Sequence, residues 1–203
     1  MLDYTITELD ISKRNLTQLP DDIHLYTNLQ KLDCFENNIT QLDNLPIGLK
    51  ELYCFENNIT QLDNLPPGLE KVYCYYNNIT QLNNLPQGLK ELNCSGNKIT
   101  QLDNLPPGLI ELYCSNNQIT QLNNLPIGLK ILNCSYNKIT QLDNLPPSLK
   151  LLDCTANQIT QLNNLPLSLE YLYCFDNSLQ YDFISTLENI KNYITSHVKI
   201  PCS

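Results

Sequence analysis

The cysteines are the most reactive side chains of this sequence of 203 residues, and there are nine of them. A thiolate is a nucleophile and a metal ligand, and two thiols can join in a disulfide, so the cysteines could catalyse, bind zinc or cross-link the chain. All but the last, Cys202, recur at intervals of twenty residues. The recurring set is Cys34, Cys54, Cys74, Cys94, Cys114, Cys134, Cys154 and Cys174.

The spacing of these cysteines argues against each of the three chemistries. Zinc ligands usually include two residues close in sequence, but there is no C-x-x-C, and the histidines, His24 and His197, lie at opposite ends. Parallel strands in register would hold equivalent cysteines about 4.8 Å apart, whereas a disulfide needs Cβ atoms about 3.8 Å apart. A reactive thiol needs exposure beside positive charge. We therefore expect no metal, no cofactor and no catalytic residue, and cysteines that pack as small apolar side chains.

The elements that position the cysteines are tandem repeats. Each unit reads L-x-x-L-x-C-x-x-N-x-I-T-Q-L-x-N-L-P, as in LKELNCSGNKITQLDNLPPG at residues 89–108. A longer, degenerate unit comes first, with Ile6, Leu9 and Ile11 at matching offsets and Arg14 in place of the asparagine. The regular units begin at Leu29, Leu49, Leu69, Leu89, Leu109, Leu129, Leu149 and Leu169. Such units stack, because none can bury its apolar face alone.

The two ends differ from the middle, as the exposed ends of a stacked array require. PDDIHLYTNL predicts a helical turn that starts at Asp21 or Asp22. Near the carboxyl end, apolar residues take helical spacing at Phe183, Ile184, Leu187, Ile190, Ile194 and Val198. We expect one domain over residues 1–203, with a capping repeat at 1–28, eight repeats at 29–180 and a helical cap at 181–203.

The repeat resembles the leucine-rich repeat family over residues 6–180. The twenty-residue unit and the NLPPGLKEL rhythm look like the short LPX class, which is found in injected bacterial effectors, and similar short units occur in giant-virus proteins. The resemblance implies a solenoid with a curved parallel β-sheet on its concave face and a C-terminal capping helix. In effectors that are ligases a catalytic domain follows the repeats, and only residues 181–203 follow here, so it implies a recognition module.

The constant positions of the units indicate how they pack. Around each L-x-C, leucine and cysteine should point inward and their neighbours outward, because side chains alternate along a strand. The asparagine column, from Asn37 to Asn177, should form a buried hydrogen-bonded ladder where each chain leaves the sheet. Proline after each N-L fixes φ, so we expect an extended, polyproline-like return path instead of helices.

The variable outward positions are where function is expected. Aromatic residues gather on three neighbouring units near the amino end, flanked by two glutamates, whereas the middle units carry small polar residues. Exposed aromatics among polar residues are typical of recognition surfaces, and the alternative is a cross-strand aromatic stack that only stabilises the sheet. The predicted partner-binding residues are Phe35, Glu36, Tyr53, Phe55, Glu56, Tyr73, Tyr75 and Tyr76.

Composition narrows the class of protein. A net charge of −9 argues against nucleic acid, because binding phosphates needs clustered lysine and arginine. No apolar run is long enough to span a membrane, and the amino terminus does not read as a signal peptide, so we expect a cytoplasmic protein, in the host cytoplasm if it is an effector or viral protein. We predict a monomeric, non-enzymatic module that binds a protein with a basic or mixed-charge surface. The alternative is a structural repeat array without a specific partner.

Overall fold

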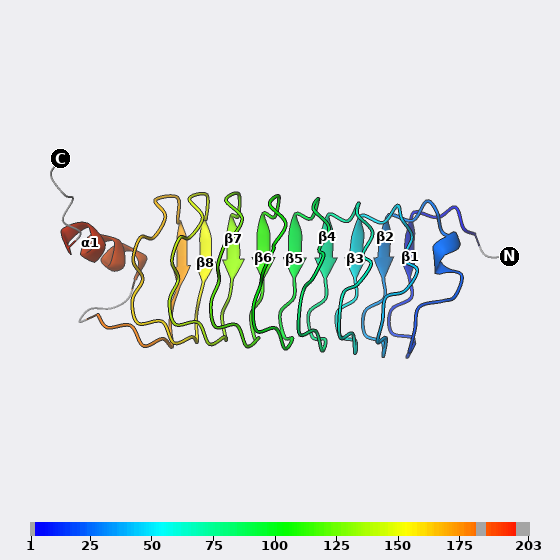
Figure 1. The fold of residues 1–203 in the computed structure, drawn as a ribbon, viewed down its shortest axis with the longest axis horizontal. Coiled ribbons are helices and arrows are strands. Elements are labelled where there is room, and N and C mark those ends of the chain that lie inside the picture. The colour runs from blue at the N-terminus through cyan, green and yellow to red at the C-terminus, as the bar shows by residue number, and fades with distance from the viewer. Residues whose placement is uncertain (1–2, 182–185, 198–203) are drawn as a thin grey trace.

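The fold is a solenoid of short parallel strands, seen in a computed structural model that describes residues 3–181 and 186–197. Within those residues the strands form one nine-stranded sheet in chain order, and each pairs with the next (Figure 1). They are β1 (Glu8–Asp10), β2 (Lys31–Asp33), β3 (Glu51–Tyr53), β4 (Lys71–Tyr73), β5 (Glu91–Asn93), β6 (Glu111–Tyr113), β7 (Ile131–Asn133), β8 (Leu151–Asp153) and β9 (Tyr171–Tyr173). This confirms the predicted class of parallel solenoid.

The degenerate first unit stacks on the array as its offsets predict. Leu9 of β1 pairs with Leu32 of β2, and the Ile11 N–H donates to the Asp33 carbonyl at 2.8 Å. A 3-10 helix, η1 (Ile23–Leu25), follows and lies at the amino-terminal end of the solenoid (Figure 1). Asp22 precedes η1 as predicted, but its side chain makes no capping hydrogen bond to it.

The carboxyl end carries the helix α1 (Leu187–His197). Ile190 is fully buried, and its N–H donates to the Thr186 carbonyl at 3.0 Å. Of the residues whose spacing predicts this helix, Phe183, Ile184 and Val198 lie outside the described residues. The predicted helix is therefore present at Leu187–His197. For the rest of residues 181–203 the helical cap stays a prediction.

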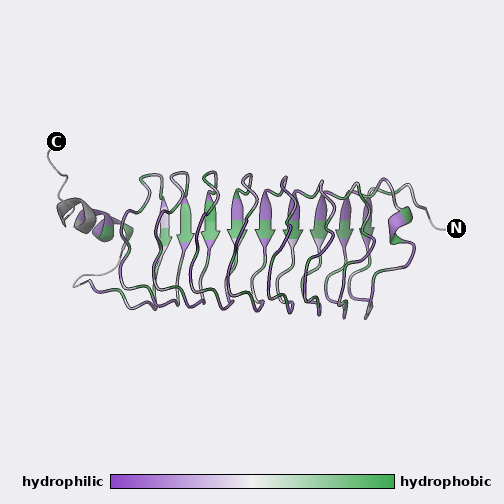
Figure 2. Cartoon of the chain, viewed as in Figure 1, coloured by the Kyte–Doolittle hydropathy of each residue, from purple (hydrophilic) through white to green (hydrophobic). Residues whose placement is uncertain are grey.

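The core consists of repeated columns. Leu92, Cys94 and Ile99 of one unit have no exposed surface, and the equivalent residues of the neighbouring units are buried in the same way. The first outward column changes character along the sheet: it holds charged residues from β2 to β6, then Ile131 in β7 and Leu151 in β8. Figure 2 shows this change as greener strands toward the carboxyl end. The sheet face is therefore charged in its amino-terminal part and more apolar beyond it.

The chain leaves the sheet earlier than the sequence pattern predicts. Each strand of the regular units ends one residue before the cysteine, although the Cys34 N–H still donates to the Tyr53 carbonyl at 2.9 Å. Two residues after the cysteine, the backbone turns into the left-handed region, with φ of 50° at Glu36, 51° at Glu56 and 51° at Tyr76. The prediction that Glu36, Glu56 and Tyr76 occupy outward positions on strands is therefore wrong: they lie in a turn beyond the strand, because a left-handed residue bends the chain away from the strand direction.

Left-handed backbone favours glycine and costs other residues about 1–2 kcal/mol. Ala156 holds φ 52° at this turn. We expect Ala156→Gly to raise the free energy of unfolding by about 0.5–1 kcal/mol, opposite to the usual destabilising effect of glycine. Urea titration followed by circular dichroism measures the change.

The reciprocal variant is the control for that prediction. Gly96 has φ +63°, and a Cβ there would clash with Cδ1 of Tyr76. Gly96→Ala should therefore destabilise the fold, by about 1–2 kcal/mol. If both variants changed the free energy of unfolding equally and in the same direction, the two positions would not share a requirement for left-handed backbone.

The asparagine ladder is confirmed, and each asparagine joins two units. The Asn57 amide donates to the carbonyls of Cys34 at 3.0 Å and Cys54 at 3.2 Å, and its oxygen accepts from the Ile39 N–H at 2.9 Å. The same bonds recur at every unit up to Asn177. Arg14 replaces asparagine in the first unit, where its N–H donates to Asn37 Oδ1 at 3.0 Å and no earlier unit needs bridging.

The return path is built from tight turns, as the prolines predict. The Leu49 N–H donates to the Pro46 carbonyl at 3.2 Å, and the equivalent turn closes every later unit. Asn44, just before the N-L-P corner, is left-handed at φ 56°, and so are its equivalents. From the end of η1 to residue 181 the chain forms no helix. The narrow return path leaves the sheet face as the broad variable surface of each unit.

Candidate partner-binding face

The predicted aromatic cluster forms two stacks that run along the solenoid axis. In the first, Phe35 and Phe55 are parallel at 7° with ring centroids 4.4 Å apart, and Phe55 and Tyr75 are parallel at 8° and 4.3 Å apart. In the second, Tyr53 and Tyr73 lie 5.0 Å apart at 17°. All five rings are half-buried, because each covers a face of its neighbour.

The tyrosine hydroxyls of the sheet face donate to glutamates. Tyr53 donates to Glu51 at 3.0 Å and Tyr73 donates to Glu91 at 2.9 Å. Burial, followed by the bond to the Glu51 carboxylate, raises the pKa of Tyr53 to about 12. Burial and Glu91 raise the pKa of Tyr73 in the same way. Both phenols therefore stay neutral donors at physiological pH, and the second stack is also hydrogen-bonded to glutamates of the sheet face.

The amino-terminal ends of both stacks are covered by lysines of the chain itself. The Lys13 ammonium lies 5.7 Å from the Phe35 ring centroid and 3.0 Å from Glu36. The Lys31 ammonium lies 5.3 Å from the Tyr53 ring centroid. Neither lysine is among the residues predicted for the cluster. The signal was the offset of 23 residues between the first two units, which places Lys13 in the column of Glu36.

The exposed members of the predicted site are Glu36, Glu56 and Tyr76. The Tyr76 side chain meets Tyr75 edge-on, with centroids 5.6 Å apart at 78°. The structure thus brings all eight predicted residues together on three neighbouring units, as two half-buried stacks with three exposed residues beside them. The stabilising and the recognition interpretations both fit this arrangement.

A second aromatic group lies at the other end of the sheet. Tyr171, Tyr173 and Phe175 of the last unit are exposed, at 56%, 45% and 67%. None of these three residues is among the predicted partner-binding residues. The signal was available: a ring is half-buried where the next unit stacks on it, and these three rings belong to the last unit.

The cysteine column is buried, as predicted. Burial raises the pKa of the Cys94 thiol to about 12 and raises the pKa of Cys54, Cys74 and Cys114 well above the ordinary value. A neutral, buried thiol is a poor nucleophile and a poor metal ligand. Among the residues described, no three His, Cys, Asp or Glu side chains are grouped so as to hold a metal ion.

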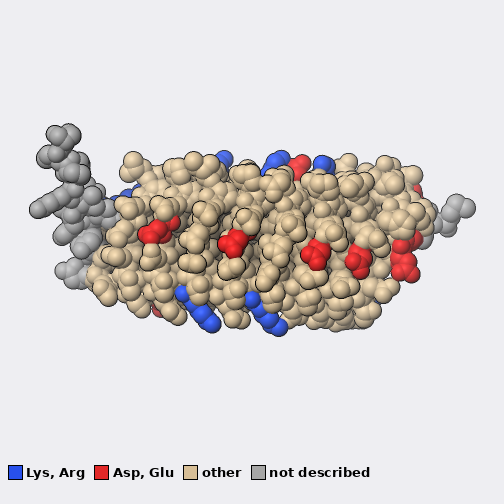
Figure 3. Space-filling model, viewed as in Figure 1, with Lys and Arg blue, Asp and Glu red and all other residues tan. Residues whose placement is uncertain are grey.

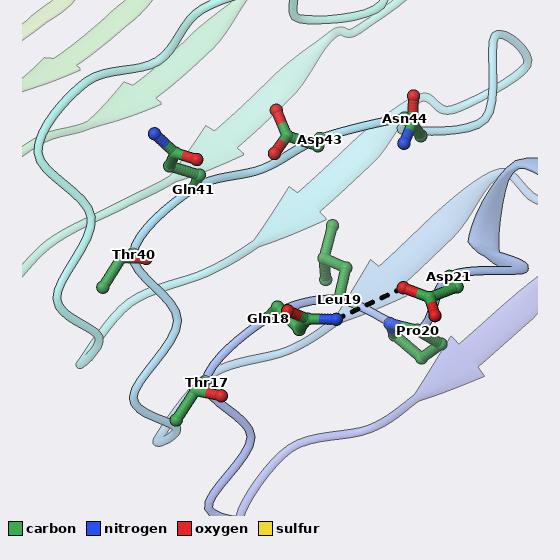
Figure 4. A pocket seen from close by; sticks show the side chains of 9 residues that line it. All are labelled: Thr17, Gln18, Leu19, Pro20, Asp21, Thr40, Gln41, Asp43 and Asn44. Carbon is green, nitrogen blue, oxygen red and sulfur yellow. Dashed lines mark hydrogen bonds between the residues drawn. The ribbon is translucent and has the colours of Figure 1, made fainter.

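A polar hollow of about 250 Å³ lies beside the first two units (Figure 4). Gln18 donates to Asp21 at 3.2 Å on the side formed by the first unit, and Thr40, Gln41, Asp43 and Asn44 of the second unit line the other side. No nucleophile with an adjacent base lines it. The hollow does not resemble an enzyme active site.

The charge of the surface is mainly acidic. Figure 3 shows a row of acidic residues along the middle of the face in view, with basic residues toward its upper and lower edges. The whole sequence has 21 acidic and 12 basic side chains. None of the helices in the described ranges is long and apolar enough to cross a membrane.

The comparisons with known proteins agree with the repeat geometry. A sequence model described as Leucine Rich repeats (2 copies) matches residues 67–107 and 87–127. The solved functional domain of InlJ from Listeria monocytogenes, described as including a cysteine ladder, is 37% identical with a TM-score of 0.79. That match covers 88% of this chain and 41% of the InlJ chain. The fold is a leucine-rich repeat solenoid.

Two further leucine-rich repeat structures are informative. A Shigella effector domain is 27% identical with a TM-score of 0.57, over 96% of this chain and 78% of its own. TLR13, solved as a complex with ssRNA13, is 26% identical with a TM-score of 0.68, over 85% of this chain and 29% of its own. The comparison with curated proteins returned no match. The chain thus spans well under half of InlJ and of TLR13, and the leucine-rich repeat fold itself is typical of protein-interaction modules.

Proposed function

We propose that this chain is a non-enzymatic module that binds a protein partner on its concave sheet face. The observation that carries the proposal is the continuity of the amino-terminal cluster, in which ring contacts join three successive units into one patch. Stabilising the sheet explains the half-buried rings. It does not explain two neighbouring glutamates and an exposed tyrosine beside them, since two carboxylates at equivalent turn positions of adjacent units repel each other.

The partner we expect has a basic or mixed-charge surface. Glu36 is paired with Lys13, and no salt bridge to Glu56 is found among the described residues. A partner cation near Glu56 would relieve the repulsion between the two carboxylates. TLR13 with its RNA shows that a leucine-rich repeat protein can bind nucleic acid. The net charge of −9 favours protein for this chain.

We also assign the unit to the short LPX class, supported by its twenty-residue length and by the likeness to the Shigella effector domain. A monomer in a reducing cytoplasm, including that of a host cell, fits a column of buried thiols. A structural array without a partner is the alternative function, and the following experiment separates the two.

The test is a pair of charge reversals in the same two units. Glu36→Lys with Glu56→Lys changes the sheet face, and Asp43→Lys with Asp63→Lys makes the same change on the return path, where both residues are exposed. Affinity capture followed by mass spectrometry should identify a partner that the first variant loses, by tenfold or more in a later binding assay, and the second retains. Identical captures by both variants and the original chain, with intact circular dichroism spectra, would refute binding at this face.

A further inference from the structure

Both aromatic stacks end at the same place, where the next unit carries small polar residues. Tyr73 is followed in register by Asn93, and the next unit has Ser95 and Gly96 in the columns of Tyr75 and Tyr76. The two units are in direct contact there, since the Tyr76 N–H donates to the Ser95 carbonyl at 2.9 Å. We call this place the aromatic step, formed by Tyr73, Tyr75, Tyr76, Asn93, Ser95 and Gly96.

The opposite ends of the stacks show what these ring faces attract. Lys13 lies over the outer face of Phe35 and Lys31 over the outer face of Tyr53. The negative face of an aromatic ring attracts a cation within about 6 Å of its centroid. At the aromatic step the described residues place no ammonium or guanidinium over Tyr73 or Tyr75. Each stack therefore ends in an aromatic ring face on both sides, with a lysine of the chain over the amino-terminal face and no cation of the described residues over the other.

The residues that follow the rings in the next unit are small or bonded to their own backbone. Asn93 Oδ1 accepts from the Ser95 N–H at 3.1 Å, so the Asn93 side chain folds onto its own backbone. The Tyr76 ring lies over Gly96, where any Cβ would clash with it. Tyr75 and Tyr76 meet at 78° and so form two walls nearly at right angles. A flat group could contact both walls.

The charge at the step is negative. The charged groups that act on Tyr75 are Glu56 and Glu36, and those that act on Tyr73 are Glu91 and Glu111. Lys71 lies near by but is already paired with Glu91 at 3.0 Å. Lys90 is likewise paired with Glu70. Each of these pairs also neutralises a carboxylate, and Glu36 is paired with Lys13, so Glu56 and Glu111 are the two glutamates of this group that form no salt bridge among the described residues. An incoming cation would therefore meet ring faces and these two carboxylates.

We propose that the aromatic step binds an arginine side chain of the protein partner. A guanidinium is planar, stacks on aromatic rings and donates to carboxylates, whereas an ammonium has no flat face to stack. This inference rests on the proposed function and names the group that the sheet face recognises. The neighbouring lysines Lys13 and Lys31 occupy the corresponding ends within the chain, and the partner supplies the cation at this end.

The probe is arginine amide, titrated into the intact protein labelled with ¹⁵N. We expect saturable shifts of the Ser95 and Gly96 amide signals in the millimolar range, and at least fivefold weaker binding of citrulline amide, which has the same shape without the charge. Ser95→Phe extends the first stack by one ring and should abolish the shifts. Thr155→Phe makes the same kind of change in the same column beside Phe175, remote from the step, and should leave them unchanged.

Three results would overturn the inference: no saturable shift, equal binding of citrulline or lysine amide, or unchanged binding to Ser95→Phe. The outcome is separable from that of the proposed function. In one outcome, a captured partner no longer binds the variant Glu36→Lys with Glu56→Lys but still binds Ser95→Phe. The sheet face would then remain the proposed binding surface, and the proposal that the aromatic step binds arginine would be wrong. A partner kept by all variants would remove the proposed function, and the arginine titration would still decide whether the step binds a guanidinium.

Discussion

Asn117→Ala is expected to lower the free energy of unfolding by at least about 3 kcal/mol, because the substitution strands several buried groups at once. The Asn117 oxygen accepts from the Ile99 N–H at 2.9 Å. Its amide donates to the carbonyls of Cys94 at 3.0 Å and Cys114 at 3.2 Å. Each buried group left unsatisfied costs about 1–3 kcal/mol, and alanine replaces none of these bonds.

The matched control is Asn123→Ala in the same unit, where the asparagine is exposed. It should change the free energy of unfolding by less than about 0.5 kcal/mol, as most surface substitutions do. Urea titrations of the three proteins measure both values. A loss at Asn117 no larger than at Asn123 would mean that water satisfies the bonds and that the ladder does not hold neighbouring units together.

Asn117→Asp keeps the shape and makes the effect depend on pH. A buried carboxylate facing carbonyl oxygens is disfavoured, so its pKa in the folded state rises above the unfolded value of about 3.9. The variant should therefore come closest to the original stability below about pH 4. It should lose stability as pH rises from there toward the raised pKa of the folded state. Measuring the difference from the original chain at each pH removes the acid sensitivity that the two proteins share.

The stack could be predicted from sequence because the same physical requirement is repeated in every unit. A buried column at one position, such as Cys94 and Cys114, repeats at a fixed interval and is visible without a structure. The position of Ile11 opposite Cys34 could be predicted for the same reason, even across a longer first unit.

The details of the face could not be predicted in the same way. Glu36 and Tyr76 vary in type, so nothing in their identity indicates the left-handed turn. Gly96, Asn116 and Asp176 in the same column suggest it, because glycine, asparagine and aspartate adopt this conformation most readily. Whether a ring is exposed depends on the side chain in the next unit, because Phe55 is covered by Tyr75 whereas Phe175 is exposed. The sequence pattern predicts the column of a side chain but does not show which of its faces a neighbour covers.

Alkaline pH should unfold the protein through its thiols. The pKa is raised by burial for Cys34 and Cys94, to about 12, and for the five cysteines at the equivalent positions of the other units up to Cys154. A raised folded pKa contributes stability that is complete below the unfolded pKa of about 8.5 and is lost as pH rises, because only the unfolded chain can then ionise. At one pH unit above that value each thiol costs about 1.4 kcal/mol, so seven together cost roughly 10 kcal/mol near pH 9.5.

A single substitution tests whether the thiols cause that loss. Cys114→Ala removes one ionising group, so its stability relative to the original chain should improve by about 1.4 kcal/mol between pH 7 and pH 9.5. Ser115→Ala, beside it but without an ionising group, should show the same difference at both pH values. The interval lies below the ordinary tyrosine pKa of about 10, which keeps the phenols largely neutral in both states. If the relative stability of Cys114→Ala did not change with pH, the buried column would have to ionise in the folded protein, and solvent would have to reach it.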